Sequence, residues 1–367
     1  MEKIKLGDLC TPSQGQLKEK PDTVIDYIDI SSVDNETKKV TGYQTMTFSE
    51  STSIARKAVK IFSILVSTVR PNLNAVAILE NDTPNLSVAS TGFCILDCKE
   101  DTDERFVFNY CKSKVFIDDM VSQATGASYP AVSDKIVRSA LIPAYSYEKQ
   151  RHIGIILDKV SDVIEKRREE LQALDKLIKA RFVEMFGDPV LNPFSWEMKR
   201  FDEICENLDS RRKPISSGDR VEGIYPYYGA SGIVDYVEDY IFDEDILLVS
   251  EDGANLLMRS TPIAFSVSGK VWVNNHAHVV RFDKMSLQKY VEIYFSLIDI
   301  SDSITGSAQP KLNQAKLNAM MIPIPEDTLL DRYCEFLYQV DKSKVIVQKA
   351  LDEIQTLFDS LMQEYFG

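Results

Sequence analysis

The chain repeats itself once, at an offset of 180 residues, and this repeat limits the possible folds more than any single motif does. Residues 125–187 align without a gap with residues 305–367. Both stretches begin with Thr-Gly, contain an Ile-Pro pair and end at Phe-Gly. Solenoid repeats are usually only about 20–50 residues long. The offset therefore predicts a whole domain followed by one helix, used twice.

The end of each repeat has the pattern of a long amphipathic helix. From Ile153 onward, apolar residues recur at alternating steps of three and four, with Arg167 in one of these positions. This spacing places a narrow apolar stripe along a helix, which is typical of a coiled-coil seam. The predicted seam and subunit-interface residues are Leu157, Val160, Ile164, Leu171, Leu174, Ile178, Val340, Val347, Leu351, Ile354 and Phe358.

The segments before the two helices have the pattern of mixed α/β domains. Apolar runs predict strands at 26–30, 61–67, 76–79 and 92–96 in the first half, and at 246–250 and 278–281 in the second. Residues 106–120 have helical spacing, and a Gly/Pro-rich stretch at 187–193 ends the first long helix. We therefore predict an α+β chain with a first domain at 1–145, a long helix within 146–190, a second domain at 191–325 and a second long helix within 326–367.

Composition narrows the class of protein. The net charge of −14 argues against a simple basic nucleic-acid binder. The acidity is weighted to the second half, so a local basic groove remains possible. No apolar run has transmembrane length and the N-terminus does not have the pattern of a signal peptide, which predicts a cytoplasmic protein without membrane contact. The six cysteines lack zinc-site spacing, so we expect reduced thiols, with a packing role for Cys10 and Cys205.

No complete catalytic motif is found in the sequence. A phosphate-binding loop, a nucleophile elbow and a glycine-rich S-adenosylmethionine motif are all missing. Asp22, Glu36 and Lys38 resemble a nuclease triad only loosely, and a chain this charged produces such patterns by chance. His276 and His278 are two residues apart, but no further ligand follows at a familiar spacing, so a polar contact surface is favoured over a metal site.

Polar loops instead offer groups that read base edges. Arg pairs bidentately with guanine and Asn with adenine, although Asn, Gly and Ser also simply form turns. The candidate DNA-contacting residues of the first half are Arg70, Asn72, Asn74, Tyr129 and Lys135. Those of the second half are Asn255, Asn274, Asn275, His276, His278, Gln309, Lys311 and Asn313.

Three segments together resemble the specificity (S) subunits of type I restriction–modification systems. They are Ala173–Asp188 in the central helix, Gly306–Asn313 leading to Ile322–Pro325, and Asn275–Arg281. The resemblance covers essentially the whole chain. It implies two target recognition domains, each reading one half of a split double-stranded DNA site. It also implies that the two long helices pair as an antiparallel coiled coil, which gives the chain approximate two-fold symmetry.

The resemblance also implies partners and cofactors. Two methyltransferase (M) subunits dock on the helices, and restriction/motor (R) subunits join the complex. S-adenosylmethionine, ATP and magnesium belong to these partners, so we expect no cofactor on this chain and no catalysis by it alone. Because the chain is unusually acidic for a DNA reader, we expect the partners' basic surface to contribute to DNA affinity.

Three other interpretations compete with this one. A specificity module of another restriction class would carry catalytic motifs in the same chain. A coiled-coil scaffold protein would not need two mixed domains with polar loops. A magnesium-dependent nuclease built on Asp22, Glu36 and Lys38 is the least favoured.

Overall fold

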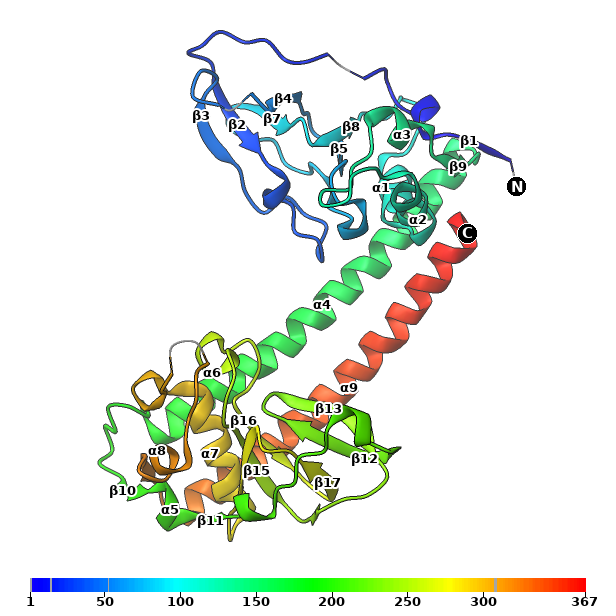
Figure 1. Ribbon diagram of the computed structural model, residues 1–367. Coiled ribbons are helices and arrows are strands. Elements are labelled where there is room, and N and C mark those ends of the chain that lie inside the picture. Colours follow the sequence, from blue (N-terminus) through cyan, green and yellow to red (C-terminus); the bar gives the residue numbers. More distant parts are fainter. Residues whose placement is uncertain (1, 14, 52, 307–308) are drawn as a thin grey trace. The chain divides into compact units, whose positions relative to one another are not determined.

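The computed structural model describes residues 2–13, 15–51, 53–306 and 309–367. The chain forms two compact units. The first unit comprises residues 1–169 and 348–367, and the second comprises residues 170–347. Helices α4 (Tyr147–Phe186) and α9 (Asp327–Phe366) are 40 residues each and contribute one half to each unit (Figure 1). The predicted helix segments therefore contain these helices, but each helix is shared between the units rather than forming a domain of its own.

The end of α4 depends on one glycine. Gly187 has a φ of 81°, in the left-handed region, and a Cβ added there would lie 2.5 Å from Cγ of Pro193. A side chain at this position would thus strain the backbone and collide with the following loop. The predicted stop at Gly187 is confirmed. At about 1.5 Å per residue, each helix is roughly 60 Å long.

The two long helices run antiparallel within each unit. In the second unit the C-terminal half of α4 pairs with the N-terminal half of α9: the Tyr333 hydroxyl donates to the Ile178 carbonyl at 3.0 Å, and Lys344 pairs with Asp175 at 2.7 Å. In the first unit Leu157 of α4 shares a core with the C-terminal turns of α9. Every predicted seam residue is buried or half-buried.

The first unit contains a three-stranded antiparallel sheet and a four-stranded mixed sheet (Figure 1). The strand order of the former is β6 (Val76–Ile78), β5 (Ile64–Ser67) and β8 (Phe93–Leu96). The order of the latter is β3 (Gln44–Thr47), β2 (Val24–Ile28), β7 (Leu86–Ser90) and β4 (Ala55–Ala58), with β2 parallel to β7. The short strands β1 (Lys3–Lys5) and β9 (Leu141–Pro143) pair with each other, and the helices are α1 (Glu104–Lys112), α2 (Lys114–Gln123) and α3 (Asp134–Ser139).

The second unit repeats this plan with different lengths. One sheet has the order β11 (Glu206–Asn207), β18 (Ala277–Arg281), β15 (Ile246–Ser250) and β16 (Ala264–Val267). The other has the order β13 (Gly232–Val237), β12 (Glu222–Gly229), β17 (Lys270–Val273) and β14 (Phe242–Asp243). Strands β10 (Glu197–Arg200) and β19 (Met321–Ile324) pair as β1 and β9 do, and the helices are α5 (Phe201–Ile204), α6 (Asn255–Met258), α7 (Met285–Leu297) and α8 (Gln314–Asn318).

The strand positions agree with the sequence, and the helical segment at 106–120 is divided into two helices. The predicted strands at 61–67 and 246–250 correspond to β5 and β15, the fully buried central strands of their sheets. The helical spacing predicted for residues 106–120 is confirmed, but the segment forms two helices, α1 and α2. Ser113 has extended backbone angles and its Oγ accepts from the Phe116 amide, so this N-cap ends α1 and begins α2.

Aromatic residues from the helix ends complete both cores. Phe366, next to the C-terminus, packs against Phe106 and Tyr110 of α1, with ring centroids 5.4 and 5.7 Å apart. Phe186, its counterpart in the repeat, lies 5.0 Å from Tyr290 of α7. All six cysteines are free thiols, and Cys10 and Cys205 each pack against the core of their own unit.

We expect Phe366→Ala to destabilise the first unit although the substitution is at the far end of the chain. Removing a fully buried phenylalanine costs about 3–5 kcal/mol. Hydrogen exchange followed by mass spectrometry in increasing denaturant should show weaker protection of α1 and β5, with the second unit unchanged. The matched control is Phe186→Ala, which should weaken the second unit. Equal loss in both units for either variant would contradict this assignment.

Candidate nucleic-acid interface

In both units the loop after the central strand is bonded to the repeated turn. In the first unit the Val132 amide donates to the Thr68 carbonyl at 2.8 Å, and in the second the Leu312 amide donates to the Glu251 carbonyl at 2.8 Å. Residues 132 and 312 are related by the repeat offset. We call this arrangement the loop–turn junction of each unit. Its hydrogen bonds are between backbone atoms, so the same bonds can form with different side chains in the two units.

The repeated turn is closed in the same way in both copies. Thr125 and Ala131 exchange backbone hydrogen bonds at 3.0 and 2.9 Å, and Thr305 and Lys311 do so at 2.9 and 2.8 Å. The glycine after each threonine has a positive φ, 102° at Gly126 and 82° at Gly306. A Cβ on either glycine would lie under 3.0 Å from a carbonyl oxygen across the turn, which explains the Thr-Gly pair in both repeats. Ser307 and Ala308 of the second copy lie outside the described residues.

The junction of the first unit exposes an arginine and a tyrosine together. Arg70 has a φ of 48°, and its amide donates to the Pro130 carbonyl at 2.7 Å. Its guanidinium lies 4.8 Å from the ring centroid of Tyr129, and the Tyr129 side chain is 69% exposed. Asn72 is exposed on the adjoining 3-10 turn (Pro71–Leu73), and Lys135 is exposed in the first turn of α3. The structure therefore brings Arg70 and Tyr129 into contact at one surface.

Asn74 requires a correction. Its side chain is only 8% exposed, and its amide nitrogen donates to the Cys111 carbonyl at 2.9 Å. Its own carbonyl accepts from the Lys38 ammonium at 2.6 Å. Asn74 thus joins the loop to α1 from inside, and its side chain does not reach the surface where a base edge would lie.

The junction of the second unit exposes a different set. Asn275 and His276 are exposed on the connection between β17 and β18, and His276 Nδ1 lies 2.9 Å from the Asp252 carboxylate. Lys311, half-exposed, extends from the repeated turn and pairs with Glu251 at 3.1 Å. Gln309 is also exposed on this turn.

Four predicted contact residues of the second unit have structural positions instead. Asn274 is 6% exposed, and its Oδ1 accepts from the His276 amide. His278 is 1% exposed. Asn313 is the N-cap of α8, and Asn255 accepts from the Ser260 hydroxyl and the Thr261 amide. For Asn274 and His278 burial removes the side chain from any base edge. For Asn255 and Asn313 the side-chain oxygens are already used in local turns.

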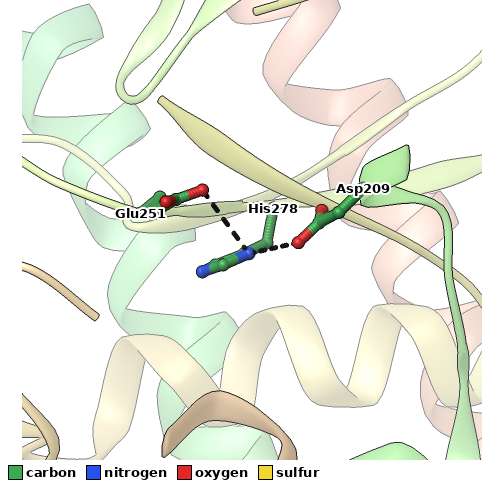
Figure 2. Close-up of side chains that lie close together, drawn as sticks. All are labelled: Asp209, Glu251 and His278. Carbon is green, nitrogen blue, oxygen red and sulfur yellow. Dashed lines mark hydrogen bonds and ion pairs between the residues drawn. The ribbon is translucent and has the colours of Figure 1, made fainter. Parts of the chain in front are cut away.

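Three ionisable side chains of the second unit, Asp209, Glu251 and His278, form a cluster shown in Figure 2. His278 Nδ1 lies 2.6 Å from a carboxylate oxygen of Asp209 and 3.7 Å from one of Glu251. Arg212 contacts both acids, at 3.3 Å from Asp209 and 2.6 Å from Glu251. The cluster connects the 3-10 turn Asp209–Arg211, the loop after β15 and strand β18.

The two half-buried acids are held in their charged forms. Burial opposes ionisation of Asp209, but the hydrogen bond from His278, the amide of Val279 and the charge of Arg212 outweigh it and lower the pKa of its carboxyl. Burial likewise opposes ionisation of Glu251, and hydrogen bonds from Arg212 and Lys311 lower its pKa. Groups with lowered pKa values stabilise the folded unit above their ordinary pKa and lose that contribution as the pH falls through the folded value.

Asp209, Glu251 and His278 form the one group with metal-ligand geometry among the residues that the structure describes. Their ligand atoms lie within 4.8 Å of one another. However, Arg212 and Lys311 already pair with the two carboxylates, and a metal ion would have to displace both cations. His276 lies outside this group, so the two histidines do not share a ligand set. The donor set fits an internal ion cluster better than a metal site.

The loose nuclease pattern is not supported by the structure. Lys38 is half-buried, and its ammonium donates to a backbone carbonyl inside the first unit. Glu36 is exposed in a turn formed around Asp34, and Asp22 is exposed in the turn before β2. A catalytic lysine would have to face the substrate phosphate, and Lys38 faces the Asn74 carbonyl instead.

Comparison with known proteins decides the family. The family of the type I restriction modification DNA specificity domain matches residues 1–175 and 193–356, one match in each half of the chain. The chain belongs to this family. Members of this family supply DNA specificity and are not catalytic.

Two curated relatives are S subunits. A putative type I restriction enzyme specificity subunit of Haemophilus influenzae is 36% identical over 140 residues, which are 38% of this chain and 36% of the relative. This chain therefore matches about a third of that relative's length. The type I restriction enzyme MjaIX specificity subunit of Methanocaldococcus jannaschii is 21% identical over 352 residues, covering 84% of this chain and 80% of the relative.

Two solved structures share the fold. One chain, from work on complex assembly and conformational transition of the type I R-M system, has a TM-score of 0.60 at 20% identity and covers 100% of this chain and 97% of its own. The type I S subunit from M. genitalium has a TM-score of 0.63 at 15% identity, with coverages of 100% and 96%. In the part of this S-family chain that the structure describes, no helix has the length and apolar content needed to cross a bilayer.

Sequence reasoning missed the buried partners of His278. Asp209 and Arg212 are one helical turn apart in a polar stretch, a spacing that also occurs on any solvated surface. Glu251 lies in the polar loop after β15, where an acidic residue has no distinctive pattern. Local sequence does not show this cluster, because its side chains come together only in the tertiary structure, from segments up to 69 residues apart.

We expect chelation to leave the second unit unchanged. Arg212 and Lys311 already neutralise the cluster, so EDTA treatment and added zinc should both leave its thermal unfolding temperature where it is in buffer alone. Differential scanning calorimetry of the full chain measures this. A zinc-induced rise that disappears in His278→Gln would show that the cluster holds a metal after all.

Proposed function

We propose that this S-family chain reads a bipartite site in double-stranded DNA, with each unit reading one half. The observation that carries the proposal is the loop–turn junction. One backbone arrangement occurs in both units, yet it presents Arg70 and Tyr129 in the first and His276 and Lys311 in the second. Contacts to the DNA phosphates position a protein on the duplex, whereas side chains that contact base edges specify the sequence. Different side chains on a common frame suit two different half-sites.

We further propose that the chain works in the cytoplasm as part of a larger complex. Two methyltransferase subunits and restriction/motor subunits would assemble on it, and S-adenosylmethionine, ATP and magnesium would act on those partners. The family membership supports this, as does the fold shared with a chain from work on type I complex assembly. The net charge of −14 agrees with it, because phosphate neutralisation would come mainly from the partners.

The direct test is methylome sequencing of a host that expresses this chain together with its methyltransferase partner. We expect methylation at one split motif, with two unlike halves separated by a fixed gap. A host that expresses the methyltransferase without this chain is the control and should lack the motif. A single undivided motif, or the same motif without this chain, would contradict the proposal.

We expect Arg70→Ala to relax preference at one half-site only. If Arg70 pairs bidentately with a guanine, its loss costs about 1–3 kcal/mol at that base pair. The measurement is selection of bound sequences from a library degenerate in both halves. His276→Ala is the matched control and should affect the other half alone. Equal weakening by Arg70→Ala on all sequences would instead make Arg70 a phosphate contact.

We expect the long helices to determine the gap between the half-sites, since each of them enters both units. Four residues inserted after Glu170, with four matching residues after Val347 to keep the seam paired, lengthen each helix by about 6 Å. That is close to two base-pair steps of about 3.4 Å. The predicted outcome is the same two half-sites with a gap longer by about one or two base pairs. An unchanged gap at full affinity would show that the helices do not measure spacing.

A further inference from the structure

His278 faces hydrogen-bond acceptors at both of its ring nitrogens. Nδ1 lies 2.6 Å from an Asp209 carboxylate oxygen, and Nε2 lies 2.8 Å from the carbonyl oxygen of Leu312. A backbone carbonyl only accepts, and so does an ionised carboxylate. A neutral imidazole carries a single N–H, so it satisfies just one of these two contacts. A doubly protonated ring satisfies both.

We propose that His278 is held as a buried imidazolium that ties the repeated turn of the second unit to its sheet, and that it is thereby a positioning residue for reading of the second half-site. This inference rests on the proposed function. Leu312, which accepts from the ring, directly follows Lys311, whose side chain reaches the exposed surface of the loop–turn junction. The charge on the ring therefore acts through the turn on the residues that face DNA.

The surrounding charges favour the proton on the ring. Asp209 comes from the 3-10 turn after β11, Glu251 from the loop after β15, Arg212 from the segment after the 3-10 turn and Lys311 from the repeated turn. The other oxygen of Asp209 already accepts from the Val279 amide at 2.8 Å. A proton on Asp209 would have to form against the interactions that lower the pKa of this carboxyl. Arg212 and Lys311 balance the charges of the two acids, but the acids are the groups in contact with the ring, at 2.6 Å for Asp209 and 3.7 Å for Glu251, so the local contacts favour the proton on Nδ1.

The loop–turn junction of the first unit forms without an equivalent of the His278 ion cluster among the described residues. Thr68 is at the place of Glu251 in the common backbone arrangement, and its hydroxyl donates to the Gly92 carbonyl at 2.8 Å. Arg70 and Tyr129 contact each other on the surface there. A change at His278 should therefore affect one half-site and leave the other as an internal control.

The protonation state can be measured directly, because the chain has three histidines in all, His152, His276 and His278. Histidine-selective ¹⁵N labelling of the full-length chain gives three ring spin systems, and His152→Gln and His276→Gln remove two of them in turn. We expect the remaining ring to have both nitrogens protonated at neutral pH. A neutral ring in the wild-type chain would overturn the proposal.

The substitution Asp209→Asn removes the carboxylate charge beside His278 and keeps nearly the same side-chain size. The amide oxygen of the new side chain can still accept from the Val279 amide, while its nitrogen donates to His278 Nδ1. We expect the ring to become neutral with its proton on Nε2, which keeps the bond to Leu312. Far-ultraviolet circular dichroism and hydrogen exchange of β15 and β18 would establish that the unit remains folded. An imidazolium that persists in this variant would contradict the role given to Asp209.

The effect on DNA reading is measured with the assembled complex, by selecting bound sequences from a DNA library that is degenerate in both half-sites. In His278→Gln we expect discrimination at the second half-site to fall about tenfold, the scale of one lost charged hydrogen bond, with the first half-site unchanged. Unaltered discrimination in folded His278→Gln would overturn the positioning role. If the wild-type complex itself showed no split-site preference, the proposed function would fail, and the protonation measurement would still stand by itself.

Discussion

The backbone hydrogen bond between the central-strand loop and the repeated turn is the contact on which the candidate interface depends. It joins Thr68 to Val132 in the first unit and Glu251 to Leu312 in the second. Since it uses no side-chain atoms, it places no demand on the neighbouring residue types. The loops are therefore free to diverge while their backbone positions are kept. Such a frame suits a protein family whose members differ in the DNA sequences they specify.

The same repeat makes the folding of the first unit depend on the end of the chain. Its core includes Phe366, which comes from the last turn of α9 and packs between Phe106 and Tyr110. The first unit is thus built from two separate segments of sequence, with the whole second unit inserted between them. Closing this long loop costs entropy, which the aromatic contacts of Phe366 and the seam of α9 help to offset. The second unit is one continuous segment of sequence, and Phe186, the counterpart of Phe366, lies within that segment.

Periodicity made the helices, the central strands and the repeated turn predictable, because each repeats a local pattern. The direction of loop side chains was not predictable in this way. Asn74 and His278 have the composition of contact residues, yet both point inward, because each satisfies a carbonyl from another segment. Arg70 is a neighbour of Asn74 in the same loop and points outward. Local sequence was also insufficient at Ser113, where a single side-chain cap divides one amphipathic pattern into two helices.

Buried charge explains how an acidic chain can have a DNA-reading surface. Asp209 and Glu251 are compensated internally by Arg212 and Lys311, so they add little to the field above the second junction. Of the two long helices only α9 is acidic, with eight acidic and four basic side chains, and other acidic groups are on exposed loops, where water and salt screen them. Base-edge contacts act over hydrogen-bond distances and do not need a basic surface, whereas phosphate affinity does. Under the proposed function, specificity and phosphate affinity would therefore reside on different subunits, with this chain contributing the specificity.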